Sequence, residues 1–186
     1  MSQLKLILLD FDGTLADTAE ANAMGYIAAL KEYGIELSRE EYFAKYFGMR
    51  CAEFLASVGV SHGDIPNVRR RKIELYPTFF NTVTLNESLW QWCQMLRRGG
   101  VKVWIVSTGH IDNISNVMRY LNIDGNVDGI ITGDDVAHPK PSPECFLKAM
   151  DIVGVTPAET IIFEDSELGL EAARCSGATY VRINLR

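Results

Sequence analysis

The residues best suited to chemistry in this chain follow its first apolar run. Residues 6–9 are all apolar, and Asp10, Asp12 and Gly13 come directly after them. This pattern predicts a buried parallel strand that ends at a loop, which is where open α/β sheets build their sites. Two neighbouring carboxylates repel each other unless a cation lies between them, and Mg²⁺ prefers oxygen ligands. The pair therefore predicts a Mg²⁺ site, although an ordinary Asp-Gly turn would use the same residue types.

Two further segments carry polar residues that suit a phosphate group. The apolar run 101–106 leads to Ser107 and Thr108, and hydroxyl and backbone N–H groups at a strand-to-helix junction can hold phosphoryl oxygens. Lys140 lies between two prolines before a predicted helix at 143–153, and prolines stiffen that approach. The alternatives are an ordinary helix start and a surface lysine in a turn.

A second acidic pair follows another apolar run. Residues 160–163 lead directly to Glu164 and Asp165, with Ser166 next. These acids again stand at the predicted end of a strand, where they could complete a metal site. The alternative is a helix start, since Asp and Ser are common in the first turn, near the positive end of the helix dipole.

Taken together, these segments resemble the four motifs of the haloacid dehalogenase-like hydrolases, which are mostly phosphatases. The matching strings are Asp-Phe-Asp-Gly-Thr-Leu from Asp10, Ser-Thr-Gly from Ser107, Lys-Pro-x-Pro from Lys140, and Glu-Asp-Ser-x-x-Gly-x-x-Ala-Ala from Glu164. They occur in the family's order and span almost the whole chain. The resemblance implies an α/β fold with a Rossmann-like parallel sheet and an inserted α-helical cap, as in the β-phosphoglucomutase-like and phosphoglycolate phosphatase-like branch.

The resemblance also implies a catalytic role for each residue. Asp10 would be the nucleophile and form an aspartyl phosphate. Asp12 would protonate the leaving oxygen and then activate water, which requires a pKa closer to neutral than that of a free Asp. Ser107, Thr108 and Lys140 would bind the transferring phosphoryl group, and Lys140 would also neutralise the nucleophile.

In the family the cofactor is Mg²⁺, and the resemblance implies its ligands here. They would be Asp10, the backbone carbonyl of Asp12, and the carboxylates of Glu164 and Asp165. Arg50, in a Gly-Met-Arg string of the predicted cap, could bind a distal phosphate or carboxylate of the substrate through two parallel hydrogen bonds. It could equally be a solvated residue at the start of a helix.

The pattern of the chain indicates how these residues are positioned. Between residues 17 and 85 only helical patterns occur, at 18–33, 38–47, 50–58 and 66–80. Downstream, helices alternate with strands, which predicts a parallel sheet. The predicted helices are 87–98, 111–121, 143–153 and 167–175, and the predicted strands are 101–106, 127–132, 160–163 and 179–183.

Two domains follow from that division. Residues 1–16 and 86–186 would form the catalytic core, and residues 17–85 would form the helical cap. A cap can close over an acidic site and exclude water, and the linkers near Asp17 and Leu85 would be its hinges. Helices that merely enlarge the core are the alternative.

Composition excludes several classes of protein. The 186 residues carry a net charge of −6, which disfavours nucleic acid or an anionic membrane as the partner. The one basic run, residues 69–72, is interpreted first as solvated charge and second as a phosphate contact from the cap. Four scattered cysteines and the lack of a signal-peptide pattern or membrane span predict a reduced, cytoplasmic protein. The oligomeric state stays open.

The predicted function is Mg²⁺-dependent hydrolysis of a small phosphorylated metabolite through an aspartyl phosphate. The main alternative is a sugar-phosphate mutase, and a second is a binding module for phosphorylated metabolites without turnover. Asp12 disfavours a dehalogenase, because that branch lacks an acid at this place. A phosphonatase would need a cap lysine of lowered pKa, and nothing in the sequence around Lys45 would lower it. His138 departs slightly from the third motif and is either a proton-active group or a turn residue.

Overall fold

The computed structural model describes residues 3–185 and divides the chain into two compact units. One unit consists of Met1–Asp17 and Thr84–Arg186, and the other of Thr18–Val83. The first contains a parallel sheet with helices on both faces, so the predicted α/β class is confirmed. In the part of the chain that the structure describes, no helix is both long and apolar enough to cross a membrane.

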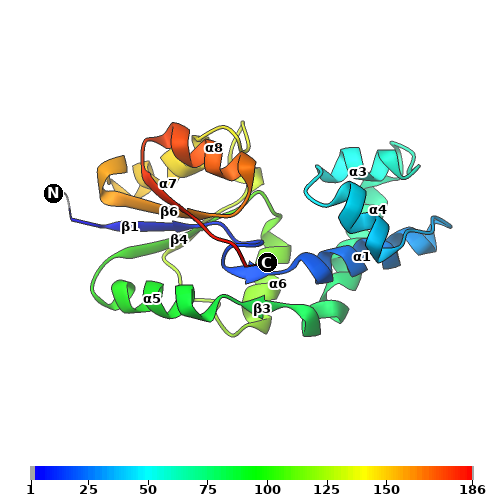
Figure 1. The fold of residues 1–186 in the computed structure, drawn as a ribbon, viewed down its shortest axis with the longest axis horizontal. Coiled ribbons are helices and arrows are strands. Elements are labelled where there is room, and N and C mark those ends of the chain that lie inside the picture. Colours follow the sequence, from blue (N-terminus) through cyan, green and yellow to red (C-terminus); the bar gives the residue numbers. More distant parts are fainter. Residues whose placement is uncertain (1–2, 186) are drawn as a thin grey trace. The chain divides into compact units, whose positions relative to one another are not determined.

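The sheet of the core unit has five parallel strands in the order β5-β4-β1-β6-β7. The central strand β1 is wholly buried, and helices α7 and α8 lie on one face of the sheet while α5 and α6 lie on the other (Figure 1). Because the strands are parallel, the residues that follow β1, β4 and β6 meet at one edge. The strands are β1 Leu6–Leu9, β4 Lys102–Val106, β5 Gly129–Ile131, β6 Thr160–Glu164 and β7 Thr179–Arg182.

Two helices of this unit begin at residues whose side chains cap the first turn. Asn86 accepts a hydrogen bond from the Leu89 N–H at the start of α5, and Ser166 accepts one from the Gly169 N–H at the start of α8. The sequence-based bounds agree with the structure to within about two residues, the usual uncertainty of helix ends. The helices are α5 Glu87–Arg98, α6 Ile111–Tyr120, α7 Glu144–Val153 and α8 Glu167–Ser176.

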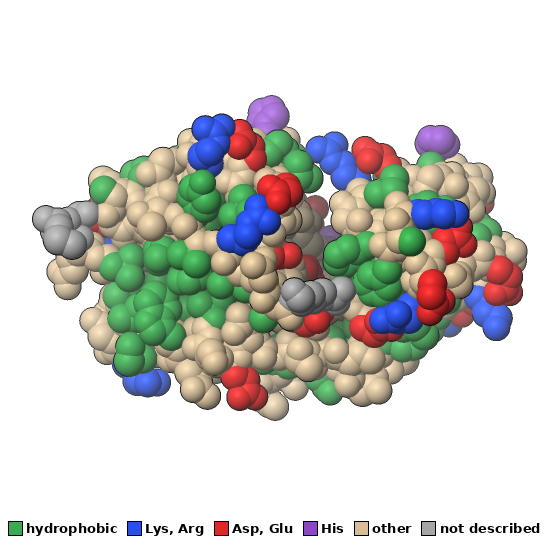
Figure 2. Space-filling model, viewed as in Figure 1, with side chains coloured by type: hydrophobic (Ala, Val, Ile, Leu, Met, Phe, Trp, Pro, Cys, Tyr) green, Lys and Arg blue, Asp and Glu red, His purple; other side chains and the backbone are tan. Residues whose placement is uncertain are grey.

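One hydrophobic cluster of this unit lies between the sheet and helices α7 and α8. Its buried members include Leu8, Val106, Phe146 and Ile162, each fully shielded from solvent. Burying such side chains contributes roughly 1.5–3 kcal/mol each, so this layer holds the strand ends in fixed positions. Apolar side chains also reach the surface of the core unit, where Figure 2 shows a group of them, and Trp92 and Met95 of α5 and Tyr180 and Val181 of β7 are exposed.

A two-stranded ribbon that the sequence did not predict connects the core unit to the second unit. Strands β2 Ala16–Asp17 and β3 Thr84–Leu85 pair antiparallel, so the chain leaves and returns along neighbouring paths. Asn86 joins the ribbon to the first loop, since its backbone N–H donates to the Leu15 carbonyl at 2.8 Å and its side chain donates to the Thr14 carbonyl at 3.1 Å. The start of the insertion is thereby tied to the loop that carries Asp12.

The second unit is helical, as predicted, but two of its elements differ from expectation. The predicted helix 38–47 is a short turn followed by a π-helix, in which the Phe47 N–H donates to the carbonyl of Tyr42, five residues earlier. The predicted helix 66–80 changes to a 3₁₀-helix at Tyr76, beside a proline that has no N–H to donate. The elements are α1 Ala19–Glu32, α2 Arg39–Glu41, the π-helix Tyr42–Tyr46, α3 Cys51–Ser57, α4 Ile65–Leu75 and the 3₁₀-helix Tyr76–Thr82.

Candidate active site

Lys140 lies at the centre of the candidate site in the core unit. Its ammonium donates to Asp10 Oδ1 at 2.7 Å, to Glu164 Oε1 at 2.6 Å and to the Val106 carbonyl at 3.1 Å. An ammonium has three donors, so this set uses all of them. The loop that delivers Lys140 thereby joins the ends of β1, β4 and β6, and three of the predicted site residues are in direct contact.

Glu164, the last residue of β6, uses both of its carboxylate oxygens. Oε1 accepts from Lys140, and Oε2 accepts from the backbone N–H and the hydroxyl of Ser166 at 2.9 and 3.1 Å. Gly169 in α8 passes so close that a Cβ there would lie 1.8 Å from Oε1. Glu164 is therefore enclosed by its neighbours, and only glycine fits at position 169.

Asp165 approaches the first loop from the other side. Its Oδ1 accepts a hydrogen bond from the Thr14 hydroxyl at 3.1 Å, and a Cβ on Gly13 would lie 2.3 Å from its Oδ2. Gly13 also has a φ of 93°, a backbone conformation that favours glycine. The Asp-Gly pair in the first motif thus serves both a turn and the close approach of a carboxylate.

Burial governs the charge of this cluster. It raises the pKa of Asp10 well above the ordinary value, although Lys140 opposes the shift. Burial also raises the pKa of Asp165, with the nearby Glu164 charge adding to the effect. For Lys140 burial lowers the pKa, but the combined attraction of Asp10 and Glu164 raises it overall, so the lysine stays protonated.

The cluster fits a divalent cation. One carboxylate oxygen each from Asp10, Glu164 and Asp165 lies within 4.8 Å of the others. Three ionised carboxylates and the single ammonium of Lys140 leave two negative charges, which one Mg²⁺ would balance, and oxygen ligands are those that Mg²⁺ prefers. The predicted fourth ligand, the backbone carbonyl of Asp12, stays a prediction.

The phosphate-binding residues that the sequence predicts follow β4. Ser107 is buried, and its hydroxyl accepts from the Gly109 N–H at 3.0 Å, while Thr108 is exposed. A Cβ on Gly109 would lie 3.4 Å from Asp12 Oδ2 and 3.2 Å from Ser107 Oγ. The Asp12 carboxylate therefore lies against the loop after β4, and the glycine leaves room for it.

Arg50 lies in the second unit, apart from this cluster in the chain, at the residue before α3. Its predicted role as a substrate contact stays a prediction. Lys45 pairs with Glu41 at 2.9 Å, and this hydrogen bond raises the pKa of the lysine. A raised pKa disfavours the neutral amine that a phosphonatase-type Schiff base needs.

The basic run 69–72 is only partly solvated. Lys72 is 3% exposed, donates to Asn22 Oδ1 at 2.6 Å, and places its ammonium 3.8 Å from the centre of the Tyr76 ring. The interpretation of the run as solvated charge is therefore wrong for Lys72, because cation–π contact and burial hold this side chain in the packing of its unit. Lys72 comes four residues after Val68, which is also buried, and this helical spacing could have shown that Lys72 faces inward.

Two histidines near the site differ in their surroundings. His110, which ends the loop after β4, accepts a hydrogen bond at Nδ1 from the Asp112 N–H at 3.3 Å and places Nε2 3.5 Å from Asp134 Oδ2. His138 contacts Glu144, with Nδ1 2.9 Å from Oε2, and its side chain is largely exposed. The sequence analysis named His138 but not His110. His110 directly follows the Ser-Thr-Gly string, and this position could have indicated that it lies near the site.

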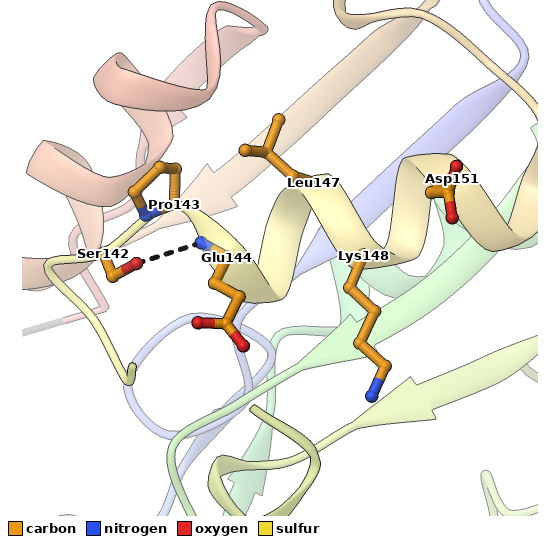
Figure 3. A pocket seen from close by; sticks show the side chains of 6 residues that line it. All are labelled: Ser142, Pro143, Glu144, Leu147, Lys148 and Asp151. Carbon is orange, nitrogen blue, oxygen red and sulfur yellow. Dashed lines mark hydrogen bonds between the residues drawn. The ribbon is translucent and has the colours of Figure 1, made fainter. Parts of the chain in front are cut away.

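An open groove of about 500 Å³ runs along α7, and none of the residues predicted to act line it (Figure 3). Its two charged side chains nearest the loops are already used. Glu144 accepts from the N–H groups of Ala137 and His138, and Lys148 donates to the Asp135 carbonyl. These two side chains therefore hold the loop that carries Lys140. Its lining residues are Ser142, Pro143, Glu144, Leu147, Lys148 and Asp151.

Comparison with known proteins agrees with the fold and identifies the family. The family model described as haloacid dehalogenase-like hydrolase matches residues 7–183, and the chain belongs to this family. The resemblance predicted from the four motifs is thus confirmed.

Among curated relatives, a phosphoglycolate phosphatase of Aquifex aeolicus is 28% identical, over 97% of this chain and 88% of that protein. The fructose-1-phosphate phosphatase YqaB of Escherichia coli is 25% identical, over 96% of both chains. The solved structure of CbbY from Rhodobacter sphaeroides in complex with phosphate has a TM-score of 0.86 and 25% identity, and it covers 98% of this chain and 87% of that one. These relatives support the predicted enzyme class, a phosphatase of the haloacid dehalogenase-like family.

Proposed function

We propose that this chain hydrolyses the phosphomonoester of a small metabolite, with Mg²⁺ as cofactor and an aspartyl phosphate on Asp10 as intermediate. The observation that carries the proposal is the contact of Asp10 with Lys140, at 2.7 Å, among carboxylates at the carboxyl edge of the sheet. A carboxylate attacks phosphorus only when its negative charge and that of the phosphoryl group are offset. Lys140 supplies one part of that positive charge.

The contact with Lys140 also orients the nucleophile. Since Lys140 holds Asp10 Oδ1, we assign Oδ2 as the atom that attacks phosphorus. The hydroxyl of Ser107, the backbone N–H groups of the same loop and the Thr108 hydroxyl would bind the phosphoryl oxygens, because they follow β4 at the same edge of the sheet. This arrangement would fix the phosphorus in line with the attacking oxygen.

Asp12 would move the protons. Its carboxyl group would donate a proton to the leaving oxygen in the first step and take one from the water that hydrolyses the aspartyl phosphate in the second. Its carboxylate lies against Gly109, so it could reach a group held by the loop after β4. The leaving group would therefore lie on the Gly109 side of the phosphoryl group.

Mg²⁺, held by Asp10, Glu164, Asp165 and the Asp12 carbonyl, would offset the charge of the phosphoryl oxygens and help to position them. We further propose residues 17–85 as the cap, since the paired strands β2 and β3 carry the chain out of the core and back into it. A cytoplasmic location is part of the proposal and agrees with four free cysteines.

Hydrolysis is preferred to mutase activity because the curated relatives that match this chain include phosphoglycolate phosphatase, fructose-1-phosphate phosphatase and the pyrophosphatase PpaX. Their substrates share a transferable phosphoryl group and differ in the rest of the molecule. The proposal for this chain is accordingly a small phosphorylated metabolite.

The test is phosphate release from a panel of small phosphomonoesters, measured with Mg²⁺ and with EDTA. Asp10→Asn is the test variant, and Asp124→Asn, an exposed acid in the loop before β5 at the other end of the strands, is the control. We expect metal-dependent release that Asp10→Asn abolishes and Asp124→Asn retains. Release that persists in Asp10→Asn would contradict the proposal, and no release with Mg²⁺ still bound would favour a mutase or a binding module.

A further inference from the structure

The loop after β4 lies where the leaving group must be, given the proposed function on which this inference rests. Asp12 can protonate the leaving oxygen only if that oxygen is next to its carboxyl group. The Asp12 carboxylate lies against Gly109, since a Cβ there would be 3.4 Å from Oδ2. The next residue of the same loop is His110.

Two acids surround the imidazole ring of His110. Nδ1 accepts from the Asp112 N–H at 3.3 Å, which places the ring proton of the neutral imidazole on Nε2. Nε2 is 3.5 Å from Asp134 Oδ2, and Nδ1 is 3.5 Å from Asp112 Oδ2. The side chains of Asp112 and Asp134 are 69% and 68% exposed, so both carboxylates face solvent. They lie at the rim that the loops after β4 and β5 form.

The two loops that form this rim offer no exposed lysine or arginine. Residues 107–118 and 132–147 contain Lys140 as their only lysine or arginine, and it is buried against Asp10 and Glu164. The acid Asp135 is occupied, since its carboxylate accepts from the N–H and hydroxyl of Thr132 at 2.8 Å. Asp112 and Asp134 are thus the exposed acids of this rim, and Lys148 of α7, which donates to the Asp135 carbonyl, is the cation that reaches it.

We infer that His110, between Asp112 and Asp134, is a specificity-determining residue that selects a neutral polyhydroxy leaving group over one bearing a second phosphate or carboxylate. Hydroxyl groups donate hydrogen bonds to carboxylates, and the imidazole Nε2–H can donate to a hydroxyl oxygen. A second anion would meet two negative charges at the rim. The same residues thus attract one class of substrate and repel the other.

The expected size of the preference follows from Coulomb's law. Two exposed carboxylates several ångströms from a second anion, in a medium between protein surface and water, should change kcat/KM by about tenfold. Salt screens such exposed charges, so the preference should shrink at high ionic strength. A preference that came from shape would not depend on salt.

The experiment compares pairs of substrates in which one leaving group is neutral and the other carries a second anionic group. One pair is 2-hydroxyethyl phosphate and 2-phosphoglycolate, which exchange a hydroxymethyl group for a carboxylate. A second pair is a ketose 1-phosphate and its bisphosphate. Phosphate release with Mg²⁺ gives kcat/KM for each, and the measured quantity is the neutral-to-anionic ratio within a pair, at low and at high salt.

Three variants test the residues that carry the inference, with Asp124→Asn as the control of equal charge change. We expect the ratio to be about ten in the unmodified chain and in Asp124→Asn, and to fall about threefold in Asp134→Asn and in Asp112→Asn, since each removes one of two charges. His110→Lys, which puts a cation at the rim, should bring the ratio to one or below. A purely structural role of His110 would lower kcat/KM for both members of a pair alike.

Equal or higher kcat/KM for the anionic members in the unmodified chain would overturn the inference. A ratio that Asp134→Asn and His110→Lys leave unchanged would also overturn it. If no member of either pair releases phosphate, while the wider panel does, the leaving group has a different chemistry and the inference is wrong. If nothing in the panel releases phosphate, the proposed function fails, and the inference fails with it.

Discussion

Lys140 and Glu164 form a buried ion pair, with 2.6 Å between Nζ and Oε1 and side chains that are 4% and 1% exposed. The same ammonium contacts Asp10, and the second oxygen of Glu164 is used by Ser166. Glu164 therefore holds Lys140 in place beside the proposed nucleophile. Glu164 would therefore serve two purposes, since the motif also predicts it as a ligand of Mg²⁺.

Glu164→Gln should separate the two tasks. Gln keeps the shape and removes the charge that fixes Lys140, so we expect kcat to fall about 10- to 100-fold, as is typical when a partner of a site residue is lost. Glu171→Gln, an exposed acid that pairs with Arg174 at 2.6 Å, is the control and should have little effect. Steady-state kinetics over a range of Mg²⁺ concentrations is the measurement. Full recovery at high Mg²⁺ would mean that Glu164 acts only as a metal ligand.

Gly169→Ala should destabilise the protein although alanine favours helices. A Cβ at this position would lie 1.8 Å from Glu164 Oε1, and strain of this kind costs about 1–3 kcal/mol. Gly25→Ala in α1 is the matched control, since a Cβ there would be 3.5 Å from Lys72, an ordinary contact. It should stabilise by about 0.5–1 kcal/mol through helix propensity. Denaturant unfolding measures both, and equal effects of the two changes would show that Glu164 does not fill the space beside Gly169.

Lys140→Met should leave Asp10 and Glu164 as buried carboxylates without their cation. Removing one partner of a buried ion pair costs about 3–5 kcal/mol, and phosphate release should be lost as well. Lys148→Met, which removes an exposed lysine that donates to the Asp135 carbonyl, should change stability by less than about 0.5 kcal/mol. A Lys140→Met protein as stable as the Lys148→Met protein would show that the ion pairs contribute little.

The stabilising effect of Mg²⁺ should grow with pH. Burial raises the pKa of Asp10 and Asp165 above the ordinary 3.8, so the folded state binds their protons more tightly than the unfolded state does. Without metal, the free energy of unfolding contributed by these groups therefore falls as pH rises above 3.8 toward the raised values. Mg²⁺ needs the ionised carboxylates and offsets their repulsion, so its effect should be larger at higher pH.

The measurement is the difference in Tm between Mg²⁺ and EDTA, taken from about pH 5 to about pH 8. Asp165→Asn, which removes one ligand oxygen with a negative charge, should reduce the difference at every pH. A difference that is constant with pH, or that shrinks as pH rises, would contradict the proposed link between burial and metal binding.

Much of the core could be predicted from the sequence because its patterns are strong. The apolar runs before Asp10, Ser107 and Glu164 are strands β1, β4 and β6, and the capping residue Ser166 begins α8 as its type suggests. Parallel strands bring their carboxyl ends to one edge, so motifs far apart in the chain meet there. The contacts of Lys140 with Asp10 and Glu164 agree with that reasoning.

The features that the sequence did not reveal depend on tertiary packing. The ribbon of β2 and β3 has only two residues in each strand, too few for a periodic signal. The enclosure of Glu164 by Gly169 depends on where α8 packs against β6, and the burial of Lys72 depends on the rings around it. The arrangement of His110 between Asp112 and Asp134 joins two loops, and no spacing in the chain indicates it.

The proposed aspartyl phosphate on Asp10 can be tested by trapping the phosphorylated chain during turnover. The protein would be mixed with Mg²⁺ and an active phosphomonoester, quenched in acid within the first turnover, digested, and its peptides analysed by mass spectrometry. We expect one added phosphoryl group on the peptide that contains Asp10, and none in Asp10→Asn. Phosphate release without any phosphorylated peptide, or with the phosphoryl group on another residue, would contradict it.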